Sequence, residues 1–167
     1  MNRILILNFT IIYCLGFNCF GQNELRLNTL DELGEAVFNT LHDGDFEEFK
    51  SLIITEKEWG QAMNQTASND SSKHELVEQL KWLQGALITN TEESFNNIRN
   101  SGLLKGLEWN NIELLSVNSV VESNEFLESG TSLIIGRYKS QEFSVSFNCC
   151  KSDVWFVCDQ LKIAYRE

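Results

Sequence analysis

The sequence contains no proline, although average usage would place roughly eight prolines in a chain of 167 residues. Internal repeats, low-complexity tracts and linkers are missing as well. A chain of this length is large enough to bury one hydrophobic core without the support of disulfides or metals. We therefore expect a single domain.

Several motifs that carry catalytic chemistry are also missing. The sequence has no Cys-x-x-Cys pair, no G-x-S-x-G nucleophile turn and no glycine-rich phosphate loop. Only two histidines are present, His42 and His74. The serines, histidines and acidic residues are not spaced in a way that brings them together as a catalytic group. The sequence therefore offers no grouped catalytic set, and we expect no cofactor.

The chain begins with the parts of a secretory signal peptide. Arg3 precedes the apolar run ILILNFTIIYCLGF, and small residues lie just before a cleavage point at Gln22. The alternative is a membrane anchor, but the run is shorter than the roughly 20 apolar residues that a span needs. We expect residues 1–21 to be a cleaved signal peptide and residues 22–167 to be one secreted or periplasmic domain without a membrane span.

The composition is strongly acidic. The chain has 13 Lys and Arg residues against 24 Asp and Glu residues, for a net charge of −11, and loss of Arg3 with the leader would make it −12. A surface of this charge repels phosphate backbones and anionic lipid headgroups. Nucleic acid is therefore excluded as an expected partner, and the acidity is better explained by solubility.

The first half of the mature chain has helical periodicity. Asn28 or Thr29 can cap a first helix, Gly44 can end it, and Asp45 can cap the next. The segment TEKE that begins at Thr55 matches a capping box, which predicts a third helical piece. A longer helix follows, with leucines at 76, 80, 83 and 87 on one face and a break near residues 90–91.

From Trp109 onward the pattern changes from helix to strand. Apolar and polar residues alternate in FSVSFNC, so Phe143 and Val145 face one side and Ser144 faces the other. Four extended runs are predicted, over residues 112–121, 133–138, 143–149 and 154–165. The expected fold class is α+β, with N-terminal helices packed on a curved four-stranded antiparallel meander.

This order of elements resembles the nuclear transport factor 2-like superfamily, also called the cystatin-like cone or SnoaL-like superfamily. Two short helices joined by GDFEEF, a longer helix and a meander ending in VWFVCDQL carry the resemblance, over most of residues 28–164. The chain is similar in particular to small exported proteins of Gram-negative bacteria, in which a segment like GLEWNNIEL leads into the sheet. Residues 153–154 are Asp-Val where those proteins often have Gly-Lys.

The resemblance implies a cone, formed by a sheet that wraps around a helix, whose mouth holds a small hydrophobic or polar ligand in some members. Its members include isomerases, dehydratases, cyclases and proteins that are not enzymes. Membership would therefore say little about function.

Three cysteines lie beyond the leader, in the closing segment NCCKSDVWFVCD: Cys149, Cys150 and Cys158. A zinc site commonly uses Cys-x2–4-Cys pairs with further Cys or His ligands, whereas adjacent strand residues point to opposite faces. The segments HELVE at His74 and DGDFEE at residues 43–48 match only parts of zinc and calcium motifs. No metal site is predicted.

The hairpin register decides whether these cysteines can form a disulfide. If residues 151–153 form the turn, Cys158 lies opposite Ser146, and a two-residue turn places it opposite Val145. Either register puts Cys158 beyond the roughly 7 Å Cα separation that a bridge to Cys149 or Cys150 allows. We expect reduced cysteines and no disulfide, with a strained Cys149–Cys150 bridge and intermolecular oxidation as the alternatives.

The same register places Asp159 among apolar side chains on the concave face of the sheet. A carboxylate there would have a raised pKa and could act as a general base, which makes Asp159 the one candidate catalytic residue. Trp59, Trp82, Tyr138 and Trp155 are the other candidates for a ligand pocket. The alternative is that the strand bends near Asp159, which then points to water or caps a turn.

Two functions are consistent with these features. The first is a non-enzymatic binding or accessory module, which forms a homodimer through an exposed sheet face. The second is an isomerase or dehydratase acting on a small molecule, with Asp159 as its base. The absence of a grouped catalytic set favours the first.

Overall fold

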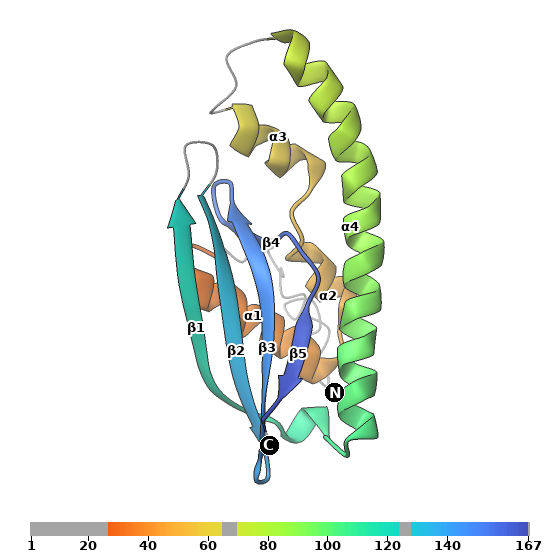
Figure 1. The fold of residues 1–167 in the computed structure, drawn as a ribbon, viewed down its shortest axis with the longest axis vertical. Coiled ribbons are helices and arrows are strands. Elements are labelled where there is room, and N and C mark those ends of the chain that lie inside the picture. The colour runs from red at the N-terminus through yellow and green to blue at the C-terminus, as the bar shows by residue number, and fades with distance from the viewer. Residues whose placement is uncertain (1–26, 65–69, 124–127, 167) are drawn as a thin grey trace, which may run out of the picture.

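The computed structural model describes the backbone of residues 27–64, 70–123 and 128–166, and the side chains of residues 27–61, 84–122 and 128–166. The predicted signal peptide lies outside the described residues. Within them the chain is α+β, as predicted, with helices first and a curved, open antiparallel sheet after them (Figure 1). No helix in the described part of the chain is both long enough and apolar enough to span a membrane.

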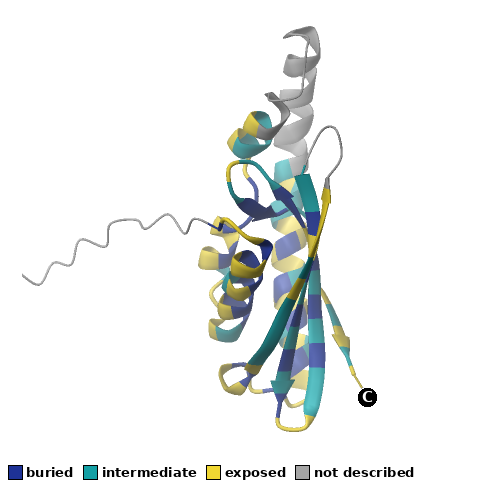
Figure 2. Ribbon diagram, turned by 90° about the vertical axis from the view of Figure 1, so that its left-hand side faces the viewer, coloured by how far each residue is buried: buried dark blue, intermediate teal, exposed yellow. Residues whose placement is uncertain are grey.

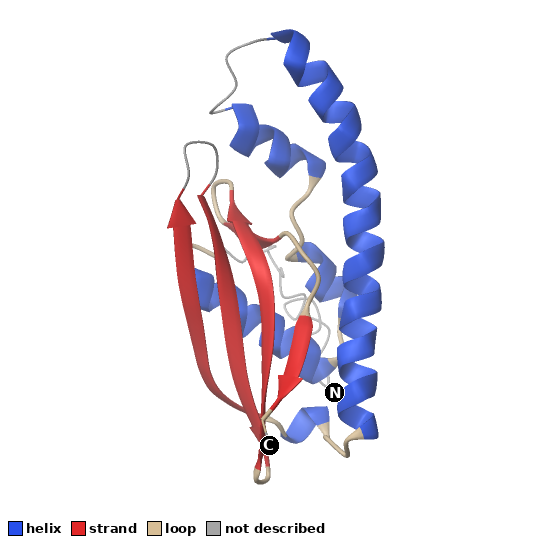
Figure 3. Cartoon of the chain, viewed as in Figure 1, coloured by secondary structure: helices blue, strands red, loops and turns tan. Residues whose placement is uncertain are grey.

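The elements follow one another in a simple order (Figure 3). The helices are α1 (Leu30–Asp43), α2 (Phe46–Ser51), α3 (Glu56–Asn64), α4 (Asp70–Leu104) and a short 3-10 helix, Trp109–Asn111. The strands are β1 (Glu113–Ser123), β2 (Glu128–Tyr138), β3 (Gln141–Lys151), β4 (Trp155–Val157) and β5 (Lys162–Tyr165).

Local side-chain chemistry sets the ends of the first helices. The Thr29 hydroxyl accepts from the Glu32 backbone N–H at 3.2 Å, and the Glu32 carboxylate accepts from the Thr29 N–H at 3.0 Å. Gly44 ends α1 in the left-handed conformation, with φ 77°. The Thr55 N–H donates to the Glu58 carboxylate at 2.7 Å, which completes the predicted capping box before α3.

Helix α4 is continuous across the predicted break near residues 90–91. Thr91 is fully buried, and its hydroxyl donates to the carbonyl of Leu87 at 2.6 Å. This bond satisfies the polar side chain inside the helix, so a β-branched residue there does not interrupt it.

The strands form one meander in the order β1-β2-β3-β4, and β5 pairs with β3 beyond the end of β4. The fourth predicted run is therefore two short strands, which both pair with β3. The alternation predicted for β3 is present, because Phe143, Val145, Phe147 and Cys149 are all at most 2% exposed. These residues and Ile134 of β2 define the inner face of the sheet.

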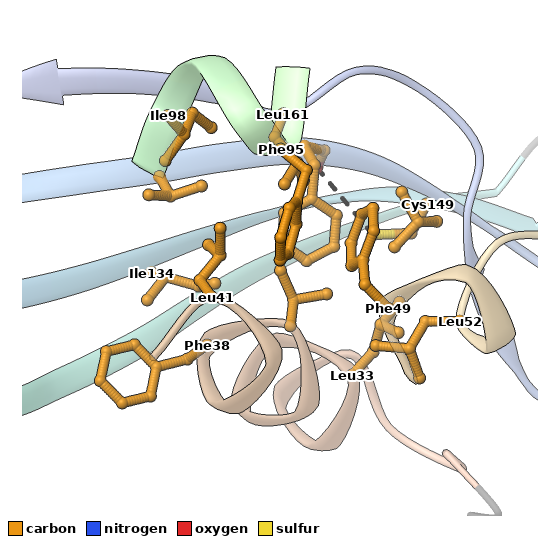
Figure 4. Close-up of a cluster of buried hydrophobic side chains, with 14 of the residues drawn as sticks. Leu33, Phe38, Leu41, Phe49, Leu52, Phe95, Ile98, Ile134, Cys149 and Leu161 are labelled. Carbon is orange, nitrogen blue, oxygen red and sulfur yellow. Dashed lines mark hydrogen bonds between the residues drawn. The ribbon is translucent and has the colours of Figure 1, made fainter. Parts of the chain in front are cut away.

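The main helical contacts with the sheet lie on its inner face. Helix α1 packs against β1 and β2, and α4 contacts β5 on the same side, where the Ser101 hydroxyl lies 2.9 Å from that of Tyr165. Phe49 of α2 stacks on Phe95 of α4 at a centroid distance of 5.0 Å, in the middle of the core (Figure 4). The core therefore lies between the inner face and the layer of helices.

The end of α4 is joined to the end of α1 through Arg99. The guanidinium group donates to the carbonyl of Leu41 and lies over the ring of Trp109, 5.8 Å from its centroid. The indole N–H of Trp109 in turn donates to the Arg99 carbonyl at 3.0 Å. These contacts hold the two helices in register over the sheet.

The approach of α1 to the sheet depends on Gly34. A Cβ atom at this position would lie 2.4 Å from a methyl group of Val117 in β1 and 2.9 Å from the hydroxyl of Ser132 in β2. Real Cβ contacts are never this short, so any other residue would push the helix away from the strands. The lack of a side chain at Gly34 thus sets how closely α1 can approach the sheet.

The first prediction compares two helical glycines. We expect Gly34→Ala to lower the free energy of unfolding by about 1–3 kcal/mol through overpacking. Gly85→Ala in α4 should raise it by about 0.5–1 kcal/mol, because nothing lies within 4 Å of the added methyl group and alanine favours the helix. Urea unfolding followed by circular dichroism measures both, and a stabilised Gly34→Ala variant would contradict the proposed packing.

Candidate functional site

The closing hairpin has a different register from the predicted one. Lys151 pairs with Trp155 and Cys150 with Phe156, so the turn occupies residues 152–154. The predicted turn at residues 151–153, which would put Cys150 opposite Val154, is wrong, because Val154 belongs to the turn and its carbonyl accepts from the Ser152 N–H at 3.0 Å. Partners in the hairpin are therefore displaced by two residues.

This register moves Cys158. Its backbone N–H donates to the carbonyl of Asn148 at 3.0 Å, so it lies opposite Asn148 and not Ser146 or Val145. Phe156 and Cys158 are two residues apart and point to the same side, which is also the side of Cys150. Cys158 is consequently closer to Cys150 than the predicted register placed it, at the diagonal position of the hairpin.

Cys150 and Cys158 belong to a second apolar cluster, which we call the hairpin cluster. Its buried members are Ile54, Cys150 and Phe156, and partly exposed Trp59, Leu87, Val154 and Cys158 pack against them. The segment before α3 closes this cluster from one side, because the Ile54 N–H donates to the Val157 carbonyl at 3.1 Å. Cys149 instead faces the main core (Figure 4).

The three cysteines are free thiols in very different settings. The Cys150 thiol donates a hydrogen bond to the sulfur of Cys158, which lowers the pKa of Cys158 and raises that of Cys150. Cys158 is partly exposed, whereas Cys150 is 0% exposed, so Cys158 is the thiol of this pair that a reagent from solution can reach. Burial in the main core raises the pKa of Cys149.

Asp159 lies in the irregular segment between β4 and β5 and is partly exposed. Its carboxylate accepts from the Asn148 side-chain amide at 2.9 Å and from the Gln160 N–H at 2.7 Å. The chain bends here because β5 resumes pairing with β3 only at Lys162, opposite Ser146. Asp159 therefore has polar partners on the side of exposed Asn148, not apolar neighbours on the concave face.

The structure does not bring the candidate pocket aromatics together. Tyr138 and Trp155 are both buried in the main core, but Tyr138 pairs with Gln141 and Trp155 with Lys151. These partners are separated by about ten residues of β3, or roughly 33 Å. Trp59 belongs to the hairpin cluster instead. The side chain of Trp82 lies outside the described ones.

The remaining titratable candidates are also dispersed. His42 lies 2.6 Å from the carboxylate of Asp43 at the end of α1. No group of three or more His, Cys, Asp or Glu residues suited to a metal ion is found among the described residues. The side chain of His74 is not described. The chemistry that the fold does bring together is the pair of thiols in the hairpin cluster.

The sheet also has an uncovered outer face, which is the front of the strands in Figure 1. Its apolar members are Val120, Leu133 and Ile135, and small polar side chains flank them: Ser116, Asn118, Thr131, Ser144, Ser146 and Asn148. All of these residues are exposed or partly exposed, and α1 lies on the opposite side of the strands, to their left in Figure 2. No helix within the described ranges packs on this outer face between β1 and Asn148 of β3.

The charges on the outer face nearly balance each other, unlike those of the whole chain. Arg137 donates to Glu142 at 2.7 Å, and Arg166 lies 3.6 Å from the same carboxylate. The Arg137 hydrogen bond lowers the pKa of Glu142. With Glu113, Glu122 and Lys162 included, and Asp159 bonded to Asn148, this face carries three basic groups (Arg137, Lys162 and Arg166) and four acidic ones.

No family model, curated protein or solved structure gives a significant match to this chain. The resemblance to the nuclear transport factor 2-like superfamily therefore stays a prediction. The thiol pair and the outer face are the features of the structure that bear on function.

The second prediction concerns thiol reactivity in the folded protein. We expect a maleimide to modify Cys158 first, and to do so at lower pH than for an ordinary cysteine, because the pKa of Cys158 is lowered. Cys149 should stay unmodified until the protein unfolds, since it is fully buried with a raised pKa. Labelling rates from pH 5 to 9, located by peptide mass spectrometry, measure both, and equal labelling of the two thiols would contradict this assignment.

Proposed function

We propose that the protein is an exported, non-enzymatic binding module that acts as a homodimer through the outer face of its sheet. The uncovered outer face, which combines a small apolar centre with paired charges, is the observation that carries this proposal. The partner that binds this face is a second copy of the chain.

Composition supports this use of the outer face. Protein interfaces resemble the rest of a protein surface in polarity but lose unpaired charge at their centre. Leu133 is flanked by Asn118 and Ser146, and Ile135 by Ser116 and Ser144, so the centre of the outer face carries no charge. Two such faces can meet without burying an unpaired ion.

Electrostatics also favours a second copy at this place. With a net charge of −11, two chains repel each other over most of their surfaces. The outer face is an exception because its acids exceed its bases by only one, and Glu142 is already paired with Arg137 and Arg166. Repulsion between copies is therefore weakest when the outer faces meet.

The alternative enzymatic function has less support. It requires a carboxylate held in an apolar pocket with helper residues. Asp159 is partly exposed and bonded to an amide, and the aromatic candidates lie in different parts of the fold. A small ligand in the cone stays a prediction of the resemblance alone.

The third prediction uses two neighbouring valines of β1 as a matched pair. Val120 is 62% exposed and belongs to the outer face, whereas Val121 is 52% exposed and points to the opposite side. We expect Val120→Lys to weaken the dimer at least about tenfold, since one buried unpaired charge costs more than the 1.4 kcal/mol that tenfold requires. Val121→Lys should leave the dimerisation constant unchanged.

Sedimentation velocity over a range of concentrations measures this constant, with circular dichroism to confirm that both variants are folded. A wild-type protein that remains monomeric would contradict the proposal. Equal weakening by both substitutions would instead place the contact at the edge of β1 and remove the outer face from it.

A further inference from the structure

The thiols of the hairpin cluster face each other across the closing hairpin. Cys150 pairs with Phe156, and Cys158 follows on the same side. Their side chains are hydrogen-bonded. This contact joins β3 to the start of the segment that leads into β5, although seven residues separate the two cysteines in sequence. The register of the β3–β4 hairpin therefore determines that these two side chains meet.

The two thiols differ in their access to solvent, as the attacking and resolving thiols of a reacting pair do. Cys158 is partly exposed and can meet a reagent from solution, whereas Cys150 is enclosed by Ile54 and Phe156. Cys149 is the neighbour of Cys150 in sequence but lies on the other side of the sheet, where its thiol donates to the Phe147 carbonyl at 3.9 Å. It is therefore kept apart from the pair.

We propose that Cys150 and Cys158 form a reversible disulfide by exchange with a disulfide-containing oxidant, such as oxidised glutathione. The Cys158 thiolate attacks one sulfur of the oxidant, whose S–S bond breaks as a mixed disulfide forms and one thiolate leaves. The Cys150 thiol then loses its proton and attacks the Cys158 sulfur, which releases the second thiolate. Two protein thiols are oxidised, and the oxidant is reduced to two thiols.

The chain has the freedom to close this bond. Diagonal neighbours in an antiparallel pair lie about 7–8 Å apart, just beyond the roughly 7 Å Cα limit for a disulfide. Cys158 lies past the end of β4, where one backbone hydrogen bond to Asn148 still holds it, and residues 159–161 leave the ladder before β5 begins. Only a shift of this connecting segment is needed. The strain of that shift makes the bridge easier to reduce than a structural disulfide.

The bond would make the hairpin cluster a redox-responsive modification site. It would tie β3 covalently to the segment that holds Asp159 and so fix the position of β5. This inference goes beyond the proposed dimer and does not depend on it, because the hairpin cluster lies beyond Asn148, outside the outer face as defined.

The experiment is peptide mapping of the purified protein after exposure to oxidised glutathione and blocking of free thiols. Trypsin cuts after Lys139, Lys151 and Lys162, so it separates the peptide with Cys149 and Cys150 from the peptide with Cys158. We expect these two peptides to be joined by a disulfide, and to separate again after mild reduction with glutathione. Three free thiols after oxidation would overturn the proposal.

Single substitutions identify the two sulfurs and their order of reaction. Cys149→Ser should form the linked peptides as the wild-type protein does. Cys150→Ala should accumulate glutathione on Cys158, because the attack that resolves the mixed disulfide is lost. Cys158→Ser should form neither the linked peptides nor a glutathione adduct at position 158. Loss of the linkage in a folded Cys149→Ser variant, or a bond between Cys149 and Cys150, would overturn the proposal.

Discussion

The structure depends on the burial of one face of the sheet under α1. Phe143, Val145 and Phe147 alternate with serines along β3, so the strand can only be stable with this side covered. Gly34 lets α1 come close enough to exclude water from it. The aromatic contacts of α2 and α4 then complete the core, and Arg99 with Trp109 fixes the ends of the helices.

Packing α1 on the inner face leaves the outer face uncovered between β1 and Asn148 of β3. Its small polar side chains and nearly balanced charges suit contact with another protein surface, whereas the rest of the chain is strongly acidic. The hairpin cluster is a second product of the same geometry. The hairpin register places Cys158 just past the end of β4 on the side of Cys150, and the chain then bends before β5.

Local patterns in the sequence predict the fold class well, because caps and alternation are decided by near neighbours. The capping box at Thr55 and the buried side of β3 are examples. The closing hairpin was mispredicted because nothing local marks Val154 as a turn residue, and an error of two positions preserves the faces while changing every partner. The thiol pair was missed for that reason. The position of Asp159 depends on the bend before β5, and the distance between the candidate pocket aromatics depends on the length of β3. The periodicity of the sequence encodes neither.

Native mass spectrometry of the protein purified from its own host tests the central claim most directly, because one spectrum reports copy number and chain length together. The account predicts a complex of two chains, each lacking residues 1–21. A single chain at every concentration, or a chain that retains its first residues, would contradict an exported module that dimerises through the outer face of its sheet.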